Sequence, residues 1–172
     1  MSTNIGLDLR QRAVLSPEVE AYVEPSTDVR MNYRELNQLI NRCASVLEGL
    51  ELKAGDRVAL LMQNSIEFVS LFYAAAKLGI VVVPLNTRLA AAELAFILSD
   101  SGTSVLFYGP ECAETTKGIK GNQEHALAIN AYIQTHPSDD DDNSLNAMLE
   151  GRSAEEPEVL HGGDDNLFIM YT

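Results

Sequence analysis

The sequence predicts an α/β protein with a three-layer, mostly parallel, doubly wound sheet, flanking helices and a short N-terminal β-hairpin. Three observations support this fold class. Apolar or β-branched runs begin near Arg57, Ile80 and Ser104, helical patterns separate them, and turn residues lie at the boundaries. A strand that returns in parallel needs a crossover of about a dozen residues, usually a helix with a right-handed connection.

The first predicted elements are a hairpin and a helix. Residues 19–23 and 28–31 flank the turn-like residues 24–27, which is typical of a hairpin. Asn32 followed by Glu35 has the spacing of a capping box, so a helix should begin there. Its predicted inward face is Leu36, Leu39, Ile40, Cys43, Val46, Leu47 and Leu50. We place Arg34, Asn37, Asn41 and Glu48 on the opposite, solvated face.

Strands and helices then alternate. Residues 57–62 are apolar without alternation, as expected of a strand that is covered on both faces. Asn64 and Ser65 should cap a second helix that ends at Gly79, and residues 80–83, all β-branched, predict the next strand. Residues 90–100 predict a third helix and residues 104–108 a third strand. The predicted inward side chains of the second helix are Ile66, Val69, Phe72, Tyr73 and Ala76, and those of the third are Leu94, Ile97 and Leu98.

The pattern is weaker after residue 110. We expect a short helix at 111–118, a short strand at 126–129, a helical turn at 144–149 and a buried strand at 167–171. Four consecutive aspartates at 139–142 repel one another, which predicts a mobile acidic loop around residues 137–144. A calcium loop is disfavoured because the spaced ligands and glycine of an EF-hand are missing.

Composition excludes several classes of protein. The chain has 172 residues, 12 Lys and Arg and 25 Asp and Glu, for a formal net charge of -13. Scattered basic residues in an acidic chain argue against nucleic acid and anionic membranes as partners. The N-terminus lacks an apolar stretch of signal-peptide length, and no uncharged run approaches the ~20 residues of a membrane span. These features favour a cytoplasmic protein, with residues 1–18 as an N-terminal segment and 19–172 as one partial α/β subdomain.

No catalytic or metal-binding constellation is evident in the sequence. Cys43 and Cys112 lack CxxC spacing, and Cys43 falls on an apolar helix face, so we interpret it as a core residue. His125, His136 and His161 share no ligand spacing, and neither GxGxxG nor GxxxxGK[ST] occurs. We therefore predict no catalytic residue and no metal ligand.

The carboxyl ends of the strands are where ligands bind in open α/β sheets. This rule directs attention to Asn86 and Arg88 after the second strand, and to Tyr171 and Thr172 at the last. Local roles are the favoured interpretation for the first pair: Asn86 would make a turn hydrogen bond, and Arg88 would pair with a nearby carboxylate.

Four stretches together resemble the N-terminal part of acyl-CoA synthetases, within the AMP-binding, adenylate-forming superfamily. They are residues 31–36 (MNYREL), 55–59 (GDRVA), 78–88 (LGIVVVPLNTR) and 164–172 (DDNLFIMYT). The order and spacing match the family from about residue 22 onward, and the Pro-Leu-Asn form resembles acyl-CoA ligases more than amino-acid-activating domains. On this resemblance the chain is truncated just before the phosphate-binding loop, which would begin at Thr172.

The resemblance implies a parent enzyme that uses ATP, Mg2+ and coenzyme A. A carboxylic acid substrate would attack the α-phosphate of ATP, release pyrophosphate, and pass from the acyl-adenylate to the thiol of coenzyme A. The glycines that would wrap the phosphates lie beyond residue 172, so we expect no cofactor and no adenylation by this chain alone. Surfaces left uncovered by truncation would favour a homodimer or aggregation.

Two other interpretations stay open at this point. The chain could be a stand-alone binding or scaffold module derived from this fold, or a fragment of an amino-acid-activating domain. A flavodoxin-like domain with only general similarity is a further alternative, but its expected phosphate loop or acidic cluster at the strand ends is absent from the sequence.

Overall fold

The computed structural model describes residues 4–25, 27–136, 144–158 and 165–171. The chain separates into two compact units, which we describe one at a time. Unit 1 comprises Met1–Ala54, Asn64–Ile80 and Gly151–Asn166, and unit 2 comprises Gly55–Gln63, Val81–Glu150 and Leu167–Thr172. The predicted acidic loop falls largely outside the described residues, as do Thr172 and His161.

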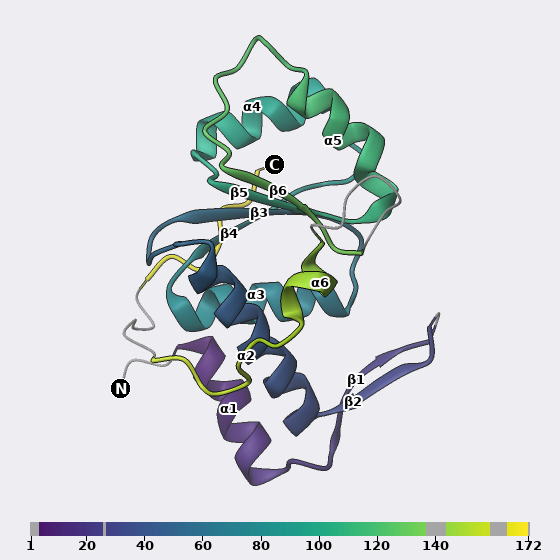
Figure 1. Ribbon diagram of the computed structural model, residues 1–172, viewed down its shortest axis with the longest axis vertical. Coiled ribbons are helices and arrows are strands. Elements are labelled where there is room, and N and C mark those ends of the chain that lie inside the picture. The colour runs from purple at the N-terminus through teal and green to yellow at the C-terminus, as the bar shows by residue number, and fades with distance from the viewer. Residues whose placement is uncertain (1–3, 26, 137–143, 159–164, 172) are drawn as a thin grey trace. The chain divides into compact units, whose positions relative to one another are not determined.

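Unit 1 is a helical cluster with a hairpin (Figure 1). Its elements are α1 (Ile5–Leu15), β1 (Glu20–Glu24), β2 (Val29–Asn32), α2 (Tyr33–Gly49) and α3 (Ile66–Leu78). The hairpin strands pair antiparallel, as predicted, and α1 packs against both α2 and α3. The sequence did not predict α1, because its apolar residues form no continuous stripe: Val14 and Leu15 are 73% and 77% exposed.

The predicted helix caps are present. The Oδ1 atom of Asn32 accepts a hydrogen bond from the backbone N–H of Glu35, and a Glu35 carboxylate oxygen accepts one from the backbone N–H of Asn32, both at 2.9 Å. Ser65 caps α3, and Gly79 ends it with φ of 69°, in the left-handed region that favours glycine. Local sequence therefore determines where these helices start and stop.

The predicted faces of α2 and α3 need correction. Asn37 and Asn41 are 8% and 3% exposed, so they are buried rather than solvated. In α3, Ile66 and Ala76 are buried as predicted, but Val69, Phe72 and Tyr73 are only half-buried. The residues that take the core side are Ser70, Leu71, Ala74, Ala75 and Lys77. Lys77 on this buried side of α3 donates hydrogen bonds to the side-chain oxygens of Asn37 and Asn41 on α2.

Unit 2 contains the predicted parallel sheet (Figure 1). Its strands are β3 (Arg57–Leu61), β4 (Val81–Pro84), β5 (Val105–Tyr108) and β6 (Ala131–Gln134), in the spatial order β4-β3-β5-β6 with every pair parallel. The helical elements are α4 (Ala91–Ser101), the 3₁₀ turn η1 (Pro110–Cys112), α5 (Ala113–Lys120) and α6 (Leu145–Leu149). The α/β fold class is confirmed.

Helices α4 and α5 cover one face of this sheet. Their Leu94, Leu98 and Ile119 pack with Ala59 and Leu106 of the strands in one buried cluster. Alternate strand residues such as Val58 and Leu60 are also buried, as predicted for the run at 57–62. The Arg57 guanidinium joins the sheet to α4 by donating to the carbonyl oxygens of Ser101 and Gly102 at 2.9 and 2.7 Å.

Two predicted strands were wrong. Residues 126–129 form no strand, and the fourth strand is β6, five residues later, because Val105 pairs with Ala131. The run at 167–171 is not a buried strand: it makes one parallel bridge, Phe168 to Val82, and Phe168 and Met170 are 46% and 62% exposed. Ile169 and Tyr171 pack on the core cluster. Successive side chains of an extended segment point to opposite sides, so Ile169 and Tyr171 contact the core while Phe168 and Met170 face away from it.

Candidate functional site

The carboxyl end of the sheet in unit 2 is the candidate site. The chain passes from β3 to β4 on one side and then crosses to β5 on the other side, so the direction of winding reverses between β3 and β5. In open α/β sheets ligands bind in the crevice outside the strand ends at such a point. The residues that follow β3, β5 and β4 therefore decide what this edge can hold.

A protein carboxylate lies at the end of β3 and β5. The Glu111 carboxylate accepts a hydrogen bond from the backbone N–H of Gln63 at 2.9 Å. A Cβ at Gly109 would meet the Glu111 carboxylate, so a larger residue there would displace the end of this flexible side chain. Glu111 thus occupies a hydrogen-bond donor at the ends of β3 and β5, a role that the sequence analysis did not assign.

The loop after β4 has the local structure predicted for Asn86. Its Oδ1 atom accepts a hydrogen bond from the backbone N–H of Arg88 at 3.0 Å, and its carbonyl accepts one from Leu89 at 3.1 Å. The predicted ion pair of Arg88 is not found among the described residues, and the Arg88 side chain is exposed. Asn86 therefore shapes the turn, while Arg88 remains at the surface beside it.

An apolar hollow lies next to this loop. Its volume is about 640 Å³, and its lining residues are Asn86, Leu89, Ala92, Glu93, Phe96, Ile97 and Tyr171. The Tyr171 hydroxyl donates to the Asp100 carboxylate at 2.7 Å, and partial burial together with this hydrogen bond raises the pKa of Tyr171. The hollow can accept an apolar or planar group, but the hydroxyl of Tyr171 is already engaged.

The histidines and cysteines of the described ranges lie in separate local environments. In those ranges, no three His, Cys, Asp or Glu residues are grouped so as to hold a metal ion. His125 makes an edge-on contact with Phe96, and His136 hydrogen-bonds to Thr135 at 3.0 Å. Burial raises the pKa of Cys43 to about 12, so its thiol is a core group rather than a nucleophile.

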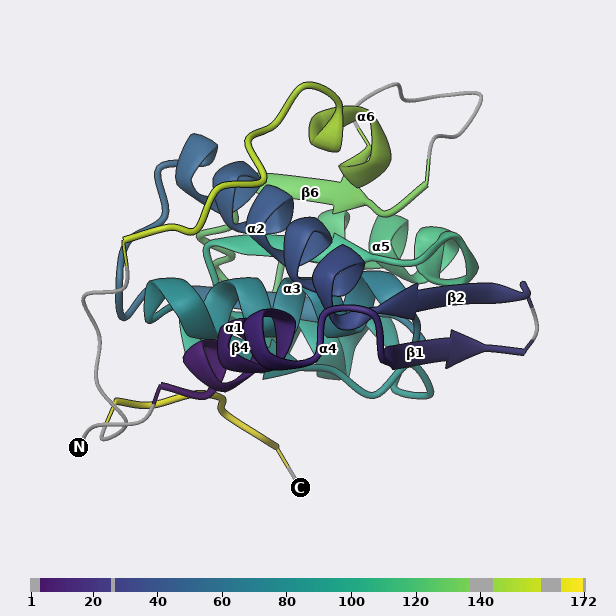
Figure 2. The ribbon, with the colours of Figure 1, turned by 90° about the horizontal axis from the view of Figure 1, so that it is seen from below.

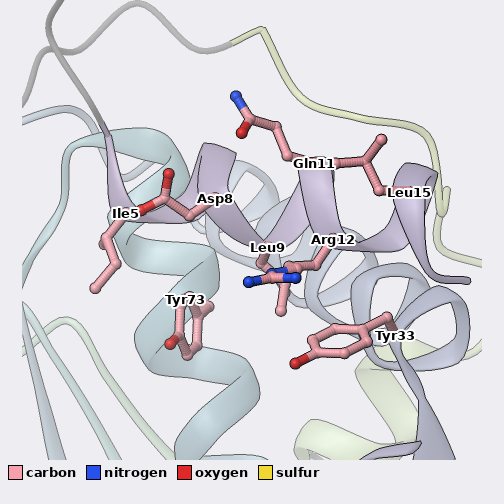
Figure 3. A pocket seen from close by; sticks show the side chains of 8 residues that line it. All are labelled: Ile5, Asp8, Leu9, Gln11, Arg12, Leu15, Tyr33 and Tyr73. Atoms are coloured by element: carbon pink, nitrogen blue, oxygen red, sulfur yellow. The ribbon is translucent and has the colours of Figure 1, made fainter. Parts of the chain in front are cut away.

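Unit 1 has a hollow of its own, of about 600 Å³, along α1 (Figure 3). The side chains of Leu9 and Arg12 extend from α1 on the side of Tyr33 and Tyr73, whereas Gln11 and Leu15 point away. Its remaining lining residues are Ile5 and Asp8. Acidic, basic and apolar groups are mixed here, so the hollow has no single chemical character.

Unit 1 also contains a buried polar cluster that sequence reasoning missed. The Lys77 side chain is 0% exposed, and its ammonium donates to the Glu156 carboxylate at 2.8 Å. The side-chain oxygens of Asn37 and Asn41 accept its other hydrogen bonds, at 2.8 and 2.6 Å. The available signals were a lysine in the apolar run 71–78 and two asparagines four residues apart on α2, which places them on one face.

The pKa values of this cluster shift because of burial and hydrogen bonding. Burial lowers the pKa of Lys77, and Glu156 partly opposes that shift. Burial alone would raise the pKa of Glu156, but hydrogen bonds from Asn37 and Lys77 outweigh it and hold the pKa below its ordinary value. The geometry, with the ammonium touching three oxygens, supports a charged pair.

Comparisons with known proteins agree with the fold. The model of the family described as "AMP-binding enzyme" matches residues 9–172. The long-chain-fatty-acid–CoA ligase FadD13 of Mycobacterium tuberculosis is 54% identical over 98% of this chain, which covers 32% of that protein. A feruloyl-CoA synthase of Amycolatopsis sp. is 33% identical over 94% of this chain and is covered to 29%. The chain thus spans about a third of the length of the curated relatives it matches.

Solved structures are similar over nearly the whole chain. A Mycobacterium tuberculosis fatty acyl CoA synthetase superposes with a TM-score of 0.91 at 54% identity, over 98% of this chain and 32% of that one. A long-chain-fatty-acid-CoA ligase from Archaeoglobus fulgidus, at 21% identity, shares the fold with a TM-score of 0.88 over 100% of this chain and 35% of that one. The family match, which covers residues 9–172, establishes that this chain belongs to the AMP-binding enzyme family.

Proposed function

We propose that this chain forms the N-terminal part of an ATP-dependent fatty-acid–CoA ligase that activates its carboxylic acid substrate as an acyl-adenylate. The observation that carries the proposal is the 54% identity to FadD13 across 98% of the chain. The similarity to a feruloyl-CoA synthase and to crotonobetaine/carnitine–CoA ligases of Escherichia coli, the latter 43% identical over 69% of the chain, supports the acid–thiol ligase class. It favours this class over amino-acid activation.

ATP, Mg2+ and coenzyme A are the cofactors that this function requires. Among the described residues, the carboxyl edge of the sheet offers an apolar hollow and the exposed Arg88, with no carboxylate cluster suited to Mg2+ and no glycine-rich cradle for phosphates. These residues do not by themselves fit the nucleotide. We therefore assign them no step of the reaction and propose that the chain alone is inactive, with Thr172 at the start of the phosphate-binding loop.

The cellular setting is also a proposal. No helix in the described ranges combines the length and apolar character needed to cross a membrane. A cytoplasmic location fits this finding and the acidic composition, and localisation of a tagged full-length protein would test it.

The test of function is pyrophosphate exchange. The full-length protein that contains this chain should exchange labelled pyrophosphate into ATP when a long-chain fatty acid is supplied, and should form the acyl-CoA when coenzyme A is added. Ferulate, carnitine and a set of amino acids serve as competing substrates. Exchange that depends on an amino acid, or no exchange with any acid, would contradict the proposal. Exchange by residues 1–172 alone above a no-enzyme control would contradict the predicted inactivity.

A further inference from the structure

The buried cluster around Lys77 has complete hydrogen bonding. A lysine ammonium has three N–H donors and no acceptor. In unit 1 these donors meet three oxygens, from Asn37, Asn41 and Glu156, at 2.6 to 2.8 Å. Two of the oxygens come from α2, and the third comes from a segment 79 residues further along the chain. The cluster thus joins α3, α2 and this later segment.

The later segment, residues 151–158, is here called the strap, and it runs along α2 (Figure 2). Its contacts are polar: Arg152 donates to the Ser45 carbonyl at 3.2 Å, and the Asn41 amide donates to the Ala154 carbonyl at 3.0 Å. The Arg152 guanidinium lies close to Gly49, where an added Cβ would be 2.7 Å from it. The third attachment is Glu156, which also accepts a hydrogen bond from the Asn37 amide at 2.5 Å.

Hydrophobic burial contributes little to the position of the strap. Its sequence, GRSAEEPE, contains only one alanine and one proline as apolar residues. The hydrophobic effect scales with the apolar area removed from water, so a strap of this composition depends on its polar attachments. Of the three attachments, the ion pair alone places a full charge in a fully buried position, where a missing partner leaves an uncompensated charge.

We propose that the Lys77–Glu156 pair is a latch that holds the strap on α2 and α3. Buried ion pairs often add little net stability, and in some proteins they fix one arrangement of the chain. This inference does not depend on the proposed function.

Accessibility of Lys77 tests the latch directly. Residues 1–172 are treated with an amine-acylating reagent, and labelling of each lysine is followed by mass spectrometry. Glu156→Ala is compared with Glu155→Ala, the same substitution at the exposed neighbouring position. We expect Lys77 to be labelled at least about tenfold faster in Glu156→Ala, because local opening then exposes its amine, and within about twofold of wild type in Glu155→Ala. Lys117, which is exposed in every variant, serves as the internal standard.

Two results would overturn the latch. One is a Lys77 labelling rate in folded Glu156→Ala equal to that of wild type, and the other is equal acceleration by Glu155→Ala. If Glu156→Ala does not fold by circular dichroism, Glu156→Gln replaces it, and trypsin cleavage after Arg152 gives a second reading. Faster cleavage there in Glu156→Gln supports the latch, and wild-type cleavage contradicts it.

Discussion

Gly6 illustrates how a single residue position is constrained by the buried Lys77 side chain. A Cβ at residue 6 would lie 2.5 Å from Lys77 Cγ and 3.1 Å from the Lys77 backbone nitrogen. The Lys77 side chain cannot easily move, because its ammonium is held by three oxygens. Glycine is therefore required by packing at this position rather than by backbone conformation.

Replacing Gly6 by alanine should destabilise the protein. Overpacking of a filled site usually costs about 1–3 kcal/mol, and we expect a loss in this range for Gly6→Ala by urea denaturation. Gly121→Ala is the matched control: φ there is -81°, and the nearest atom to an added Cβ is 3.5 Å away. A change of no more than about 0.5 kcal/mol is expected for the control. Equal losses in both variants would show that packing against Lys77 is not the cause.

The charge of Glu156 should make stability depend on acid pH. Its pKa in the folded state is held below the ordinary value of 4.5, so the folded protein binds fewer protons there than the unfolded chain. The stability contributed by Glu156 is therefore full above the ordinary pKa and is lost as the pH falls through the folded-state pKa. The difference in unfolding free energy between wild type and Glu156→Gln should shrink as pH falls from about 7 to about 3. A difference that is constant with pH would contradict the ion pair, and Glu155→Gln serves as the control.

Among the elements, α2 has the most clearly defined start. Asn32 and Glu35 exchange two hydrogen bonds of 2.9 Å, which satisfies two backbone N–H groups that a helix leaves without partners at its first turn. The sequence alone was sufficient to predict this start, because the interaction joins residues three positions apart.

Substitution of the cap tests this interpretation. Asn32→Ala should lower the unfolding free energy by about 1 kcal/mol, since the Oδ1 acceptor is removed. Asn64→Ala makes the same chemical change just before the N-cap residue Ser65 of α3 and is expected to cost no more than about 0.5 kcal/mol. Chemical denaturation of the two variants side by side gives the comparison. If Asn64→Ala costs as much as Asn32→Ala, the capping box is not the source of the loss.

The β6 strand shows where element prediction from sequence fails. Residues 126–129 and 131–134 are both short and moderately apolar, and period-two patterns this brief do not discriminate between them. The register of β5 selects the later segment, pairing Val105 with Ala131 and Phe107 with Ile133. This pairing joins residues far apart in the sequence, so a local pattern cannot predict it.

At the scale of the whole molecule, apolar side chains on the surface predict self-association. Met170 is 62% exposed at the sheet edge in unit 2, and Val14 and Leu15 of α1 in unit 1 are more exposed still. Exposed apolar groups on an edge segment favour pairing with another copy. We therefore expect residues 1–172 to form a homodimer or aggregate in solution.

Light scattering of Met170→Lys provides the measurement. The variant should have a lower apparent mass than wild type at high protein concentration, because a charge on the edge opposes pairing. Gln38→Lys adds the same charge at an exposed position of α2 and should leave the apparent mass unchanged. A monomeric wild-type protein, or an equal effect of both substitutions, would contradict association through the 167–171 edge.

The sequence by itself determined β3, β4 and β5, the capped helices and the family, because these follow from neighbouring residues: the box at Asn32, the left-handed stop at Gly79 and the apolar runs of the three strands. Only the tertiary structure decided which side of α3 is buried and which polar groups meet. The sequence predicted Asn37 and Asn41 to be solvated. In the structure they are buried, because Lys77 and Glu156 from distant parts of the chain form hydrogen bonds with them. The physical reason is that burial of a charge depends on where its partners come together in space, which the order of residues along a helix does not specify.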